Sequence, residues 1–346
     1  MYSISIIIPI YNVEKYIERC LLSVMNQEGY QGELECILVD DCTPDKSLYI
    51  AQSLIKRYQG PIRFQILHNQ ENQGLSCSRN NGLLCAKGDY VFFLDSDDSI
   101  SNDCIRCLSK QLYLYDDMVD MVIGNSFEYR NGKYWQERKD PPILLRDHND
   151  IYRKFFQIEI PMMAWNKLIR RQFLMEHNLL FAPQMVHEDE LWSFQLYDVV
   201  RSVVLISEVT YNYEQNENSI MTSSGYINRR IEACHTLIHQ MLDSLNKREL
   251  YVEKFFWGIH MYMLAEDMIY NHVLSHELID RNNELRQKMI YRTVKDGRVF
   301  LSFFLLLTIM PPCCYLVRIS WFRHKYYLIT SIFKKLALVF DFVHCK

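Results

Sequence analysis

Three aspartates at the end of an apolar run are the residues of this sequence best suited to chemistry. Asp95, Asp97 and Asp98 lie within four positions, directly after residues 90–94. Carboxylates this close repel one another, so a buried cluster must take up protons or a cation. At a solvated strand end they suit a hard divalent metal, which prefers oxygen ligands and commonly binds a phosphate as well. The alternative is a polar turn in which an aspartate caps the next helix.

The elements that position these aspartates follow from the pattern of apolar residues. Residues 90–94 carry aromatic and branched side chains without a polar break, which predicts a strand buried on both faces. Along the chain, expected strands alternate with expected helices, and this alternation indicates an α/β sheet with ligands at the carboxyl ends of its strands. Further strands are expected at residues 3–9, 35–39 and 62–67, with helices at about residues 12–24, 43–58 and 76–86, the first capped by Asn12.

A second acidic pair follows another of these strands. Asp40 and Asp41 come directly after residues 35–39, so they should lie at the same edge of the sheet as the later aspartates. An acidic edge matches a ligand that brings N–H donors and also needs a metal, and a nucleotide diphosphate does both. Its base offers an N–H to Asp41, and its phosphates share a cation with Asp95 and Asp97.

Four linked motifs resemble the inverting glycosyltransferase family 2. They are IIIPIYN, VDDCTPD, NQGLSCSRNNGLLCAKGDY and FLDSDD, and they cover residues 3–105 densely, with a looser match to about residue 215. The resemblance implies an α/β fold of the GT-A (nucleotide-diphospho-sugar transferase) type, with a Rossmann-like mixed sheet and here a C-terminal helical extension. The family often has Gly-Ser after the first acidic pair, where this chain has Cys42 and Thr43, so the detail of that loop stays open.

The resemblance also implies residues for the nucleotide-sugar donor. Pro9 and Tyr11 would line the nucleoside site, Asp41 would accept a hydrogen bond from the base, and Arg79 would lie near the donor.

The same resemblance implies the metal site and its neighbours. Asp95 and Ser96 would belong to the nucleotide-sugar site, with Asp95 facing the ribose or the metal. Asp97 would be the main ligand of Mg²⁺ or Mn²⁺.

A second chemical locus is the sequence HEDELW, which contains Glu188 and Asp189. Acidic residues in the first turn of a helix favour the helix dipole, and this alone would explain them. Family 2 enzymes place a Glu-Asp pair here, with the Asp as catalytic base. The resemblance therefore implies that Asp189 is the base and that Glu188 supports it or contacts the acceptor.

The segment between the acidic loci is expected to shape the acceptor side. Asn131-Gly132 predicts a type I′ hairpin, which would flank an acceptor cleft. The sequence WNKL at residues 165–168, before an expected helix, resembles bacterial family members that build surface polysaccharides.

Composition limits the other possibilities. The 346 residues, 49% of them hydrophobic, suffice for one sizeable domain plus an appendage. A formal net charge of -4 gives no indication of nucleic-acid binding. The 11 cysteines show no spacing typical of a disulfide framework or a four-ligand zinc site, which favours a reduced, cytoplasmic setting. The first residues predict a strand and not a signal peptide.

The chain is expected to have three parts: a catalytic domain at residues 1–215, a helical appendage at 216–297, and a hydrophobic and basic tail at 298–346. Residues 299–317 carry no charge and are long enough to span a bilayer, and the basic and aromatic residues that follow suit an anionic membrane surface. A spanning helix with a cytoplasmic basic tail would separate the catalytic domain from its nucleotide-sugar. An in-plane or re-entrant anchor bent at Pro311-Pro312 is therefore favoured, and burial in protein is the alternative.

The resulting hypothesis is an inverting, metal-dependent transfer of a sugar, most simply from a UDP-sugar, to a saccharide or lipid-linked saccharide. It would serve surface polysaccharide synthesis at the inner face of the cell membrane. One alternative is a catalytically silent, membrane-associated scaffold of the same fold. The other is a phosphatase with an aspartyl nucleophile, which needs Thr or Val where this chain has Ser99 and carries its motif near the chain start.

Overall fold

The computed structural model describes residues 1–115, 118–128, 133–135, 138–156, 159–214, 225–245, 251–273 and 275–298. The chain divides into two compact units, residues 1–223 and 224–346. The first is an α/β unit, and the described residues of the second form helices. From residue 299 onward, the tail predicted to contact a membrane lies outside the described residues. Among the residues that are described, no helix is both long and apolar enough to cross a membrane.

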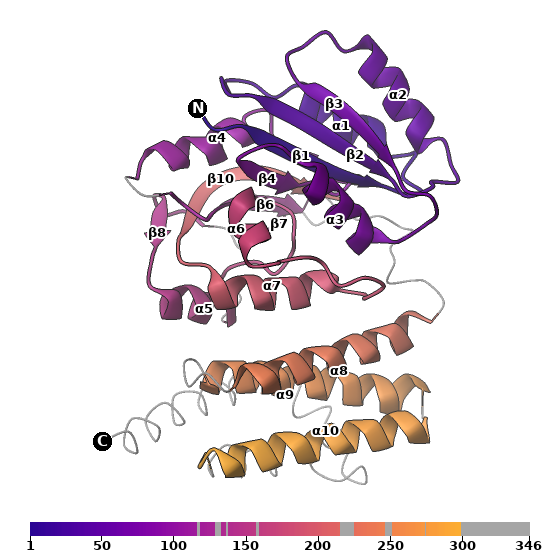
Figure 1. The fold of residues 1–346 in the computed structure, drawn as a ribbon, viewed down its shortest axis with the longest axis vertical. Helices are drawn as coiled ribbons and strands as arrows, with labels where there is room; N and C mark the ends of the chain where they lie inside the picture. Colours follow the sequence, from indigo (N-terminus) through magenta and orange to yellow (C-terminus); the bar gives the residue numbers. More distant parts are fainter. Residues whose placement is uncertain are drawn as a thin grey trace. The chain divides into compact units, whose positions relative to one another are not determined.

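A mixed sheet of ten strands forms the centre of the first unit in the described part of the chain (Figure 1). The strands are β1 (Ile4–Ile10), β2 (Leu34–Asp40), β3 (Arg63–His68), β4 (Tyr90–Phe93), β5 (Ser99–Ile100), β6 (Met121–Glu128), β7 (Lys133–Trp135), β8 (Ile143–Leu145), β9 (Lys167–Arg170) and β10 (Val203–Tyr213). Their order is β3-β2-β1-β4-β9-β6-β10-β5, with β7 beside β6 and β8 beside β10. The neighbours β3, β2, β1 and β4 run parallel, so their carboxyl ends share one edge. The predicted α/β class with a mixed sheet is confirmed.

Helices of the first unit cover the two faces of this sheet. They are α1 (Ile17–Met25), α2 (Ser47–Arg57), α3 (Leu75–Cys85), α4 (Cys104–Lys110), α5 (His148–Phe156), α6 (Arg171–Glu176) and α7 (Glu188–Val199). Apolar residues of α1 and α4 share one core with the residues on one face of β1 and β4. On the other face, α3 approaches β1 so closely that a Cβ on Gly82 would lie 2.4 Å from a methyl carbon of Ile7. Phe93 of β4 packs there against Trp192 of α7.

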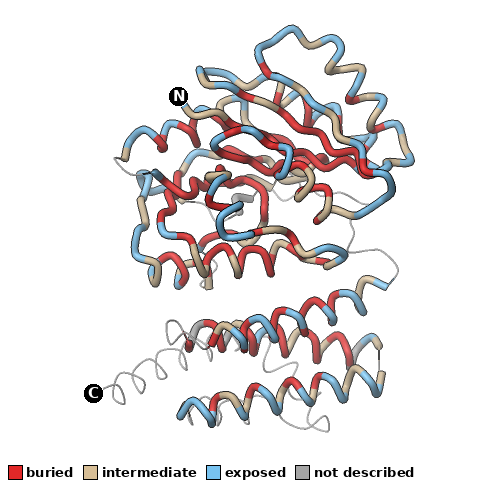
Figure 2. The backbone as a smooth tube through the Cα atoms, in the orientation of Figure 1, coloured by how far each residue is buried: buried red, intermediate tan, exposed pale blue. Residues whose placement is uncertain are grey.

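The central strands are buried along their whole length, as the red run through the sheet in Figure 2 shows. All four residues of β4 and all seven of β1 are buried. The strand predicted at residues 90–94 to be buried on both faces is therefore confirmed.

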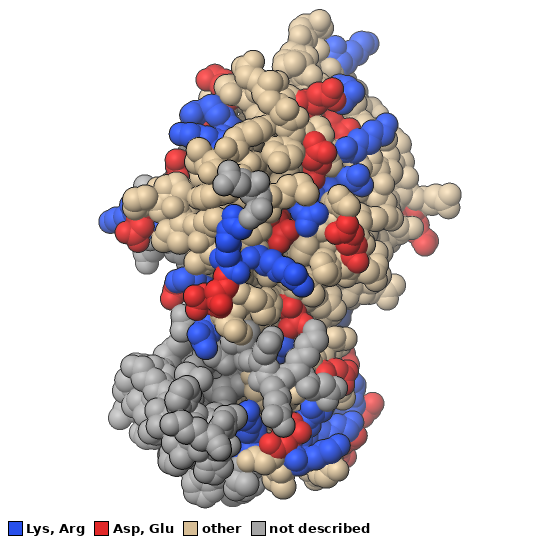
Figure 3. Space-filling view, turned by 60° about the vertical axis from the view of Figure 1, so that its left-hand side comes forward, with Lys and Arg blue, Asp and Glu red and all other residues tan. Residues whose placement is uncertain are grey.

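Acidic and basic side chains are interspersed over the coloured part of the face in Figure 3.

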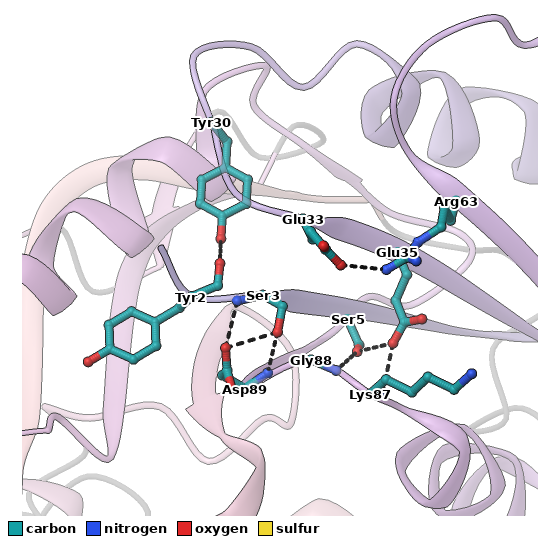
Figure 4. Close-up of polar contacts among 10 residues, drawn as sticks. All are labelled: Tyr2, Ser3, Ser5, Tyr30, Glu33, Glu35, Arg63, Lys87, Gly88 and Asp89. Atoms are coloured by element: carbon teal, nitrogen blue, oxygen red, sulfur yellow. Dashed lines mark hydrogen bonds and ion pairs between the residues drawn. The ribbon is translucent and has the colours of Figure 1, made fainter.

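Polar contacts connect the strands at the amino-terminal edge of the sheet (Figure 4). Asp89 Oδ2 accepts hydrogen bonds from the backbone N–H and the hydroxyl of Ser3, at 2.8 and 2.9 Å. The hydroxyl of Ser5 donates to Glu35 Oε1 at 2.6 Å and accepts from the N–H of Gly88 at 2.9 Å. These contacts hold β1 to β2 and to the residues just before β4.

The second unit contains the helices α8 (Tyr226–Ser244), α9 (Tyr251–Met268) and α10 (His276–Lys295). Arg281 of α10 binds both carboxylate oxygens of Glu232 on α8, at 2.5 and 2.8 Å. Buried His235 makes a 3.2 Å contact with Asn282. The helical pattern predicted after residue 220 is present in these three segments.

Two predicted helix starts are too early. The second helix begins at Ser47 and not at residue 43, and the first begins at Ile17 and not after Asn12. Asn12 has a left-handed backbone with φ 55°, and its N–H donates to the hydroxyl of Thr43 at 2.8 Å. Its neighbourhood is therefore a connection to the loop after β2 and not a helix cap.

Candidate functional site

The candidate site lies at the carboxyl-terminal edge of the sheet. Ile10, the last residue of β1, pairs with Asp40 of β2, and the N–H of Asp41 donates to the carbonyl of Ile10 at 3.0 Å. The N–H of Leu94 donates in turn to the carbonyl of Ile7 at 3.0 Å. The residues that follow β1, β2 and β4 therefore meet at one edge, as the sequence predicts. Pro9 is buried within β1, and Tyr11 is exposed directly after it.

Asp41 organises the loop that precedes α3. Its Oδ1 accepts hydrogen bonds from the side chain of Asn69 at 2.7 Å and from the N–H of Gln73 at 2.8 Å. Its Oδ2 accepts from the N–H of Gly74 at 2.8 Å. A carboxylate offers about four acceptor positions, so Oδ2 retains capacity for one further donor. Asp41 as a whole is only 3% exposed.

Arg79 of α3 joins the two acidic loci. Its Nη2 donates to Asp95 Oδ1 at 2.6 Å and its Nη1 to Glu188 Oε1 at 2.5 Å. The guanidinium also lies over the ring of Phe181, 5.2 Å from its centroid. Burial lowers the pKa of Arg79, but the charges of Asp95 and Glu188 outweigh this effect and leave it above its ordinary value. A permanent buried cation thus holds the start of α7 against the end of β4.

The three aspartates after β4 have different surroundings. Asp98 is 1% exposed, and its carboxylate accepts from the hydroxyl of Tyr211 at 2.6 Å and from the N–H of Glu214 at 2.8 Å. Burial raises its pKa, and the charges of Asp97 and Asp95 raise it further. Asp98 therefore fixes the end of β10, while Asp95 and Asp97 are partly exposed.

Asp97 and Asp95 are the residues here that could hold a divalent cation. In the described part of the chain, no group of three or more His, Cys, Asp or Glu is already gathered as a metal site. Protein-bound Mg²⁺ typically takes one or two carboxylates and completes its shell with water and substrate phosphates. Partly exposed Asp97, with Asp95 two residues before it, fits such a shared site. Ser96 between them is buried.

Arg19 of α1 contacts the loop after β4, because its Nη2 donates to the backbone carbonyl of Asp97 at 2.5 Å. Arg19 also pairs with Glu214 at 3.1 Å. No motif of the sequence singles out Arg19.

The second acidic locus forms the first turn of α7. Glu188 is buried, which raises its pKa, although its contact with Arg79 partly offsets the effect. Burial also raises the pKa of Asp189 to about 7, and the charges of Glu188 and Glu190 add to this effect. No hydrogen bond reaches the Asp189 carboxylate from the residues that the structure describes. A carboxylate with a pKa near the working pH suits a general base.

Three non-glycine residues around the site have left-handed backbones: Asn12, Cys42 and His187, with φ of 55°, 56° and 55°. Asn12 and Cys42 lie just beyond β1 and β2, and His187 directly precedes α7. Such conformations cost energy and concentrate at functional sites. Cys42 stands where family 2 members often have glycine, and its φ gives the physical reason for that preference.

Two buried residues support the site without having been predicted. Trp165 stacks on Tyr211, with ring centroids 4.4 Å apart, and Tyr211 in turn holds Asp98. Lys167 is completely buried, and its ammonium donates to the carbonyl of Met163. Their signal in the sequence is WNKL, in which Asn and Lys stand between the apolar residues Trp165 and Leu168.

Comparison with known sequences identifies the family. Residues 5–177 match the family model described as Glycosyl transferase family 2. EpsH of Bacillus subtilis (strain 168), which is named as a glycosyltransferase, is 33% identical over 229 residues, covering 63% of this chain and 62% of EpsH. The poly(ribitol-phosphate) beta-N-acetylglucosaminyltransferase TarS of Staphylococcus aureus (strain Mu50 / ATCC 700699) is 25% identical over 230 residues, covering 66% of this chain and 38% of TarS. The chain therefore spans less than two thirds of the length of these relatives.

Solved structures share the fold. The crystal structure of S. aureus TarS 1-349 superimposes with a TM-score of 0.63 at 18% identity, covering 84% of this chain and 80% of that one. The same TarS segment has been solved in complex with UDP-GlcNAc, with a TM-score of 0.58. The mannosyltransferase PcManGT from Pyrobaculum calidifontis, in complex with GDP-Man and Mn²⁺, gives a TM-score of 0.52 at 15% identity over 96% of this chain and 86% of that one. The GT-A fold predicted from the motifs is confirmed.

Proposed function

The chain belongs to glycosyl transferase family 2, and we propose that it transfers a sugar from a nucleotide-diphosphate donor to a hydroxyl of a saccharide or lipid-linked saccharide, with inversion at the anomeric carbon. The observation that carries this proposal is the Arg79 bridge. It connects Asp95, at the strand end where a donor would bind, to Glu188, beside the carboxylate proposed as the base. Donor and base are thereby proposed to lie on either side of one buried cation.

The proposed donor is a UDP-sugar. Oδ2 of Asp41 retains capacity for one N–H donor, as a base ring would supply, and exposed Tyr11 lies beside the same strand end. Pro9, Asp95 and Ser96 complete the proposed nucleotide-sugar site. The UDP-GlcNAc complex of TarS supports the choice, since that protein shares the fold.

Asp189 is the proposed base. It takes the proton from the acceptor hydroxyl while the oxygen of that hydroxyl forms a bond to the anomeric carbon. The bond from that carbon to the diphosphate oxygen breaks, and its electron pair leaves with the diphosphate. Attack opposite the leaving group inverts the anomeric centre. Glu188, held by Arg79, keeps the first turn of α7 in position for this step.

Mg²⁺ or Mn²⁺ is the proposed cofactor, with Asp97 as its main protein ligand. When bound, the cation supplies positive charge to the departing diphosphate. The Mn²⁺ in the complex of PcManGT supports a divalent metal in this fold.

The proposed organisation assigns residues 1–215 to catalysis and 216–297 to a helical appendage. Association with the inner face of the cell membrane through residues 298–346 stays a prediction from the sequence, because residues 299–346 lie outside the described part. Loss of vesicle binding on deleting residues 299–346 would support it, and unchanged binding would contradict it.

The decisive experiment incubates the protein with a panel of UDP- and GDP-sugars and measures release of the nucleotide, with and without Mn²⁺ and saccharide acceptors. We expect slow hydrolysis of one donor, faster release with an acceptor, and loss of both with EDTA. Asp189→Asn should lower transfer by about 10²- to 10⁴-fold and leave UDP affinity within about 2-fold, since Asp189 is not assigned to the nucleotide site.

Other outcomes would reject this function. UDP binding without hydrolysis or transfer for any donor would indicate a silent scaffold. Phosphate release from a simple phosphomonoester would indicate the phosphatase. Full turnover by the Asp189→Asn variant would remove Asp189 as the base.

A further inference from the structure

Helix α3 carries three polar residues in succession, Arg79, Asn80 and Asn81. The helix is fixed against the sheet directly after them, because Gly82 allows it to approach Ile7 of β1 closely. Successive residues of a helix lie about 100° apart around its axis, so the three side chains point in different directions. Arg79 joins the two acidic loci, and the two asparagines contact two other segments of the site.

Asn81 contacts the residue that holds the carboxylate of Asp41. Its Nδ2 donates to Oδ1 of Asn69 at 2.9 Å. Asn69 is 9% exposed, and its own Nδ2 donates to Asp41 Oδ1 at 2.7 Å and to the hydroxyl of Ser78 at 3.1 Å. Asn81 therefore fixes the amide of Asn69 in the orientation that directs its N–H groups to Asp41.

Asn80 contacts the connection between α6 and α7. Its Nδ2 donates to the carbonyl of Phe181 at 2.9 Å, and its Oδ1 accepts from the N–H of the same residue at 2.9 Å. One side-chain amide thus pairs with both backbone groups of Phe181. Because Phe181 is 1% exposed, removing the amide would leave buried backbone groups without this partner, which is costly.

The ring of Phe181 anchors the same connection to the site. It lies under the Arg79 guanidinium, 5.2 Å from ring centroid to Cζ, and it stacks on Trp192 of α7 with centroids 4.7 Å apart. The indole N–H of Trp192 donates to the carbonyl of Leu179 at 3.0 Å. The position of Phe181 and the position of α7 are therefore linked.

The backbone between Phe181 and α7 is strained. Gln184 and His187 both have left-handed conformations, with φ of 59° and 55°. Such conformations persist only where the surrounding structure holds them. The anchor at Phe181 holds one end of this stretch, and the N–H of Glu190, which donates to the carbonyl of His187 at 3.1 Å, holds the other. Loosening Phe181 would therefore release the stretch that leads to Asp189.

We propose that the two asparagines are positioning residues with separate roles. Asn80 holds the connection to α7, and with it Asp189, in place for the acceptor. Asn81 holds Asn69, and with it Asp41, in place for the nucleotide. This inference rests on the proposed function, in which Asp41 binds the nucleotide base and Asp189 takes the proton. Neither asparagine is assigned a contact with a substrate.

The first test compares UDP affinity, measured by calorimetry with Mn²⁺, with kcat for the UDP-sugar that the wild type consumes. Asn80→Ala should lower kcat by about 10- to 100-fold and leave UDP affinity within about 2-fold, because a small displacement of a catalytic group is enough to slow the reaction. A weakened UDP affinity with an unchanged kcat in this variant would overturn the proposal.

Asn81→Ala should give the opposite pattern. UDP affinity should fall by about 3- to 10-fold, the effect of one hydrogen bond, because the N–H groups of Gln73 and Gly74 still hold Asp41. At saturating donor, kcat should stay within about 2-fold. Leu84→Ala is the control on the same helix, since Leu84 is 57% exposed, and it should change neither quantity. Equal losses of affinity and kcat in both asparagine variants would indicate a general loss of structure and overturn the proposal.

The second test needs no sugar transfer. Hydrogen–deuterium exchange of the backbone amides is followed in residues 69–74 and 180–187 of the wild type and both variants. Asn80→Ala should speed exchange by about 10-fold in residues 180–187 alone, and Asn81→Ala should do so in residues 69–74 alone. Faster exchange of both segments in each variant, or of neither segment, would overturn the proposal.

The two tests separate the possible failures. A wild-type chain that neither binds UDP nor transfers sugar, but whose variants loosen different segments, would reject the proposed function and keep the division between the asparagines. A chain that transfers sugar, but whose variants exchange alike, would keep the function and reject the division. Should an alanine variant not fold, Asn80→Asp or Asn81→Asp, which removes the amide N–H donor at nearly constant size, should give changes in the same directions.

Discussion

The two edges of the central sheet use the same strands but satisfy their polar groups differently. At the amino-terminal edge, Ser5 both donates and accepts hydrogen bonds, and its partners Glu35 and Gly88 join neighbouring segments. At the carboxyl-terminal edge, carboxylates gather around buried Arg79, and Asp189 accepts no hydrogen bond from the described residues. The first arrangement serves stability. The second leaves the Asp189 carboxylate able to accept a proton or a hydrogen bond, which binding and proton transfer require.

Removing Arg79 should destabilise the carboxyl-terminal edge more than any of the substitutions that follow. Arg79→Met leaves Glu188 and Asp95 without their buried cation, and loss of one partner of such a pair costs about 3–5 kcal/mol. We expect a large fall in the free energy of unfolding, measured with urea, together with loss of transfer.

Arg63→Met is the matched control at the other edge. The Arg63–Glu33 pair in Figure 4 is mostly exposed, with side-chain exposures of 69% and 74%, and such pairs add about 0–1 kcal/mol. Equal losses in the two variants would contradict the contrast between the edges.

The pH dependence should distinguish stability from activity at Asp189. Its pKa is raised to about 7 in the folded chain, above the value of about 4 expected when unfolded. The folded state therefore binds this proton more tightly, and its contribution to stability is full below about pH 4 and is lost as the pH rises to about 7. A pKa difference of one between the two states corresponds to about 1.4 kcal/mol, so a difference of about three corresponds to a loss of at most about 4 kcal/mol. Activity should change in the opposite direction, because the base must be ionised.

The measurement compares urea unfolding of wild type and Asp189→Asn between about pH 4 and pH 8, alongside kcat of the wild type. The variant should gain stability relative to wild type as the pH rises. A constant difference between the two proteins would mean that Asp189 titrates normally.

Ser5→Ala should weaken the amino-terminal edge alone. It leaves the buried N–H of Gly88 without its acceptor, which costs about 1–3 kcal/mol. Thermal unfolding should register this loss, while kcat should stay within about 2-fold of wild type because Ser5 lies at the far end of β1. A comparable fall in kcat would show that the two edges are coupled.

Cys42→Gly should give the smallest effect and should stabilise the chain. Glycine adopts φ 56° without the cost of about 1–2 kcal/mol that an L-residue incurs there. It also adds freedom to the unfolded chain, so the expected net gain is about 0.5 kcal/mol in the free energy of unfolding. Gly74→Ala, at φ 87°, should change stability in the opposite direction. Destabilisation by Cys42→Gly would mean that the contact of the thiol with Asn69 outweighs the strain.

The sequence predicted the parts of the site that follow local patterns. Apolar runs located β1, β2 and β4, and the acidic residues after β2 and β4 lie at one edge because parallel strands align their ends. Strand β9 escaped prediction because its four residues pair with segments far away in the chain. The contact of Asp98 with Tyr211 of β10 likewise joins residues far apart in the chain.

Asn12 shows that a strong local pattern can also predict the wrong structure. Its side chain suits a helix cap, but Thr43, on another loop, takes its N–H, and the left-handed backbone excludes the cap. Local propensity gives no information on that partner. The family resemblance supplied Glu188 and Asp189, whose residue types alone are equally explained by the helix dipole.

The Arg79–Glu188 contact closes a segment of chain, since its ends lie 109 positions apart in sequence. Substitutions, insertions or exchanges between relatives within that segment can remodel its surface while this ion pair and the two hydrogen bonds between Asn80 and Phe181 hold the two ends together. Chimaeras that take residues 125–187 from a relative, and keep the pair itself together with Asp95, Ser96 and Asp97, should therefore be an economical way to graft a new acceptor preference onto this scaffold.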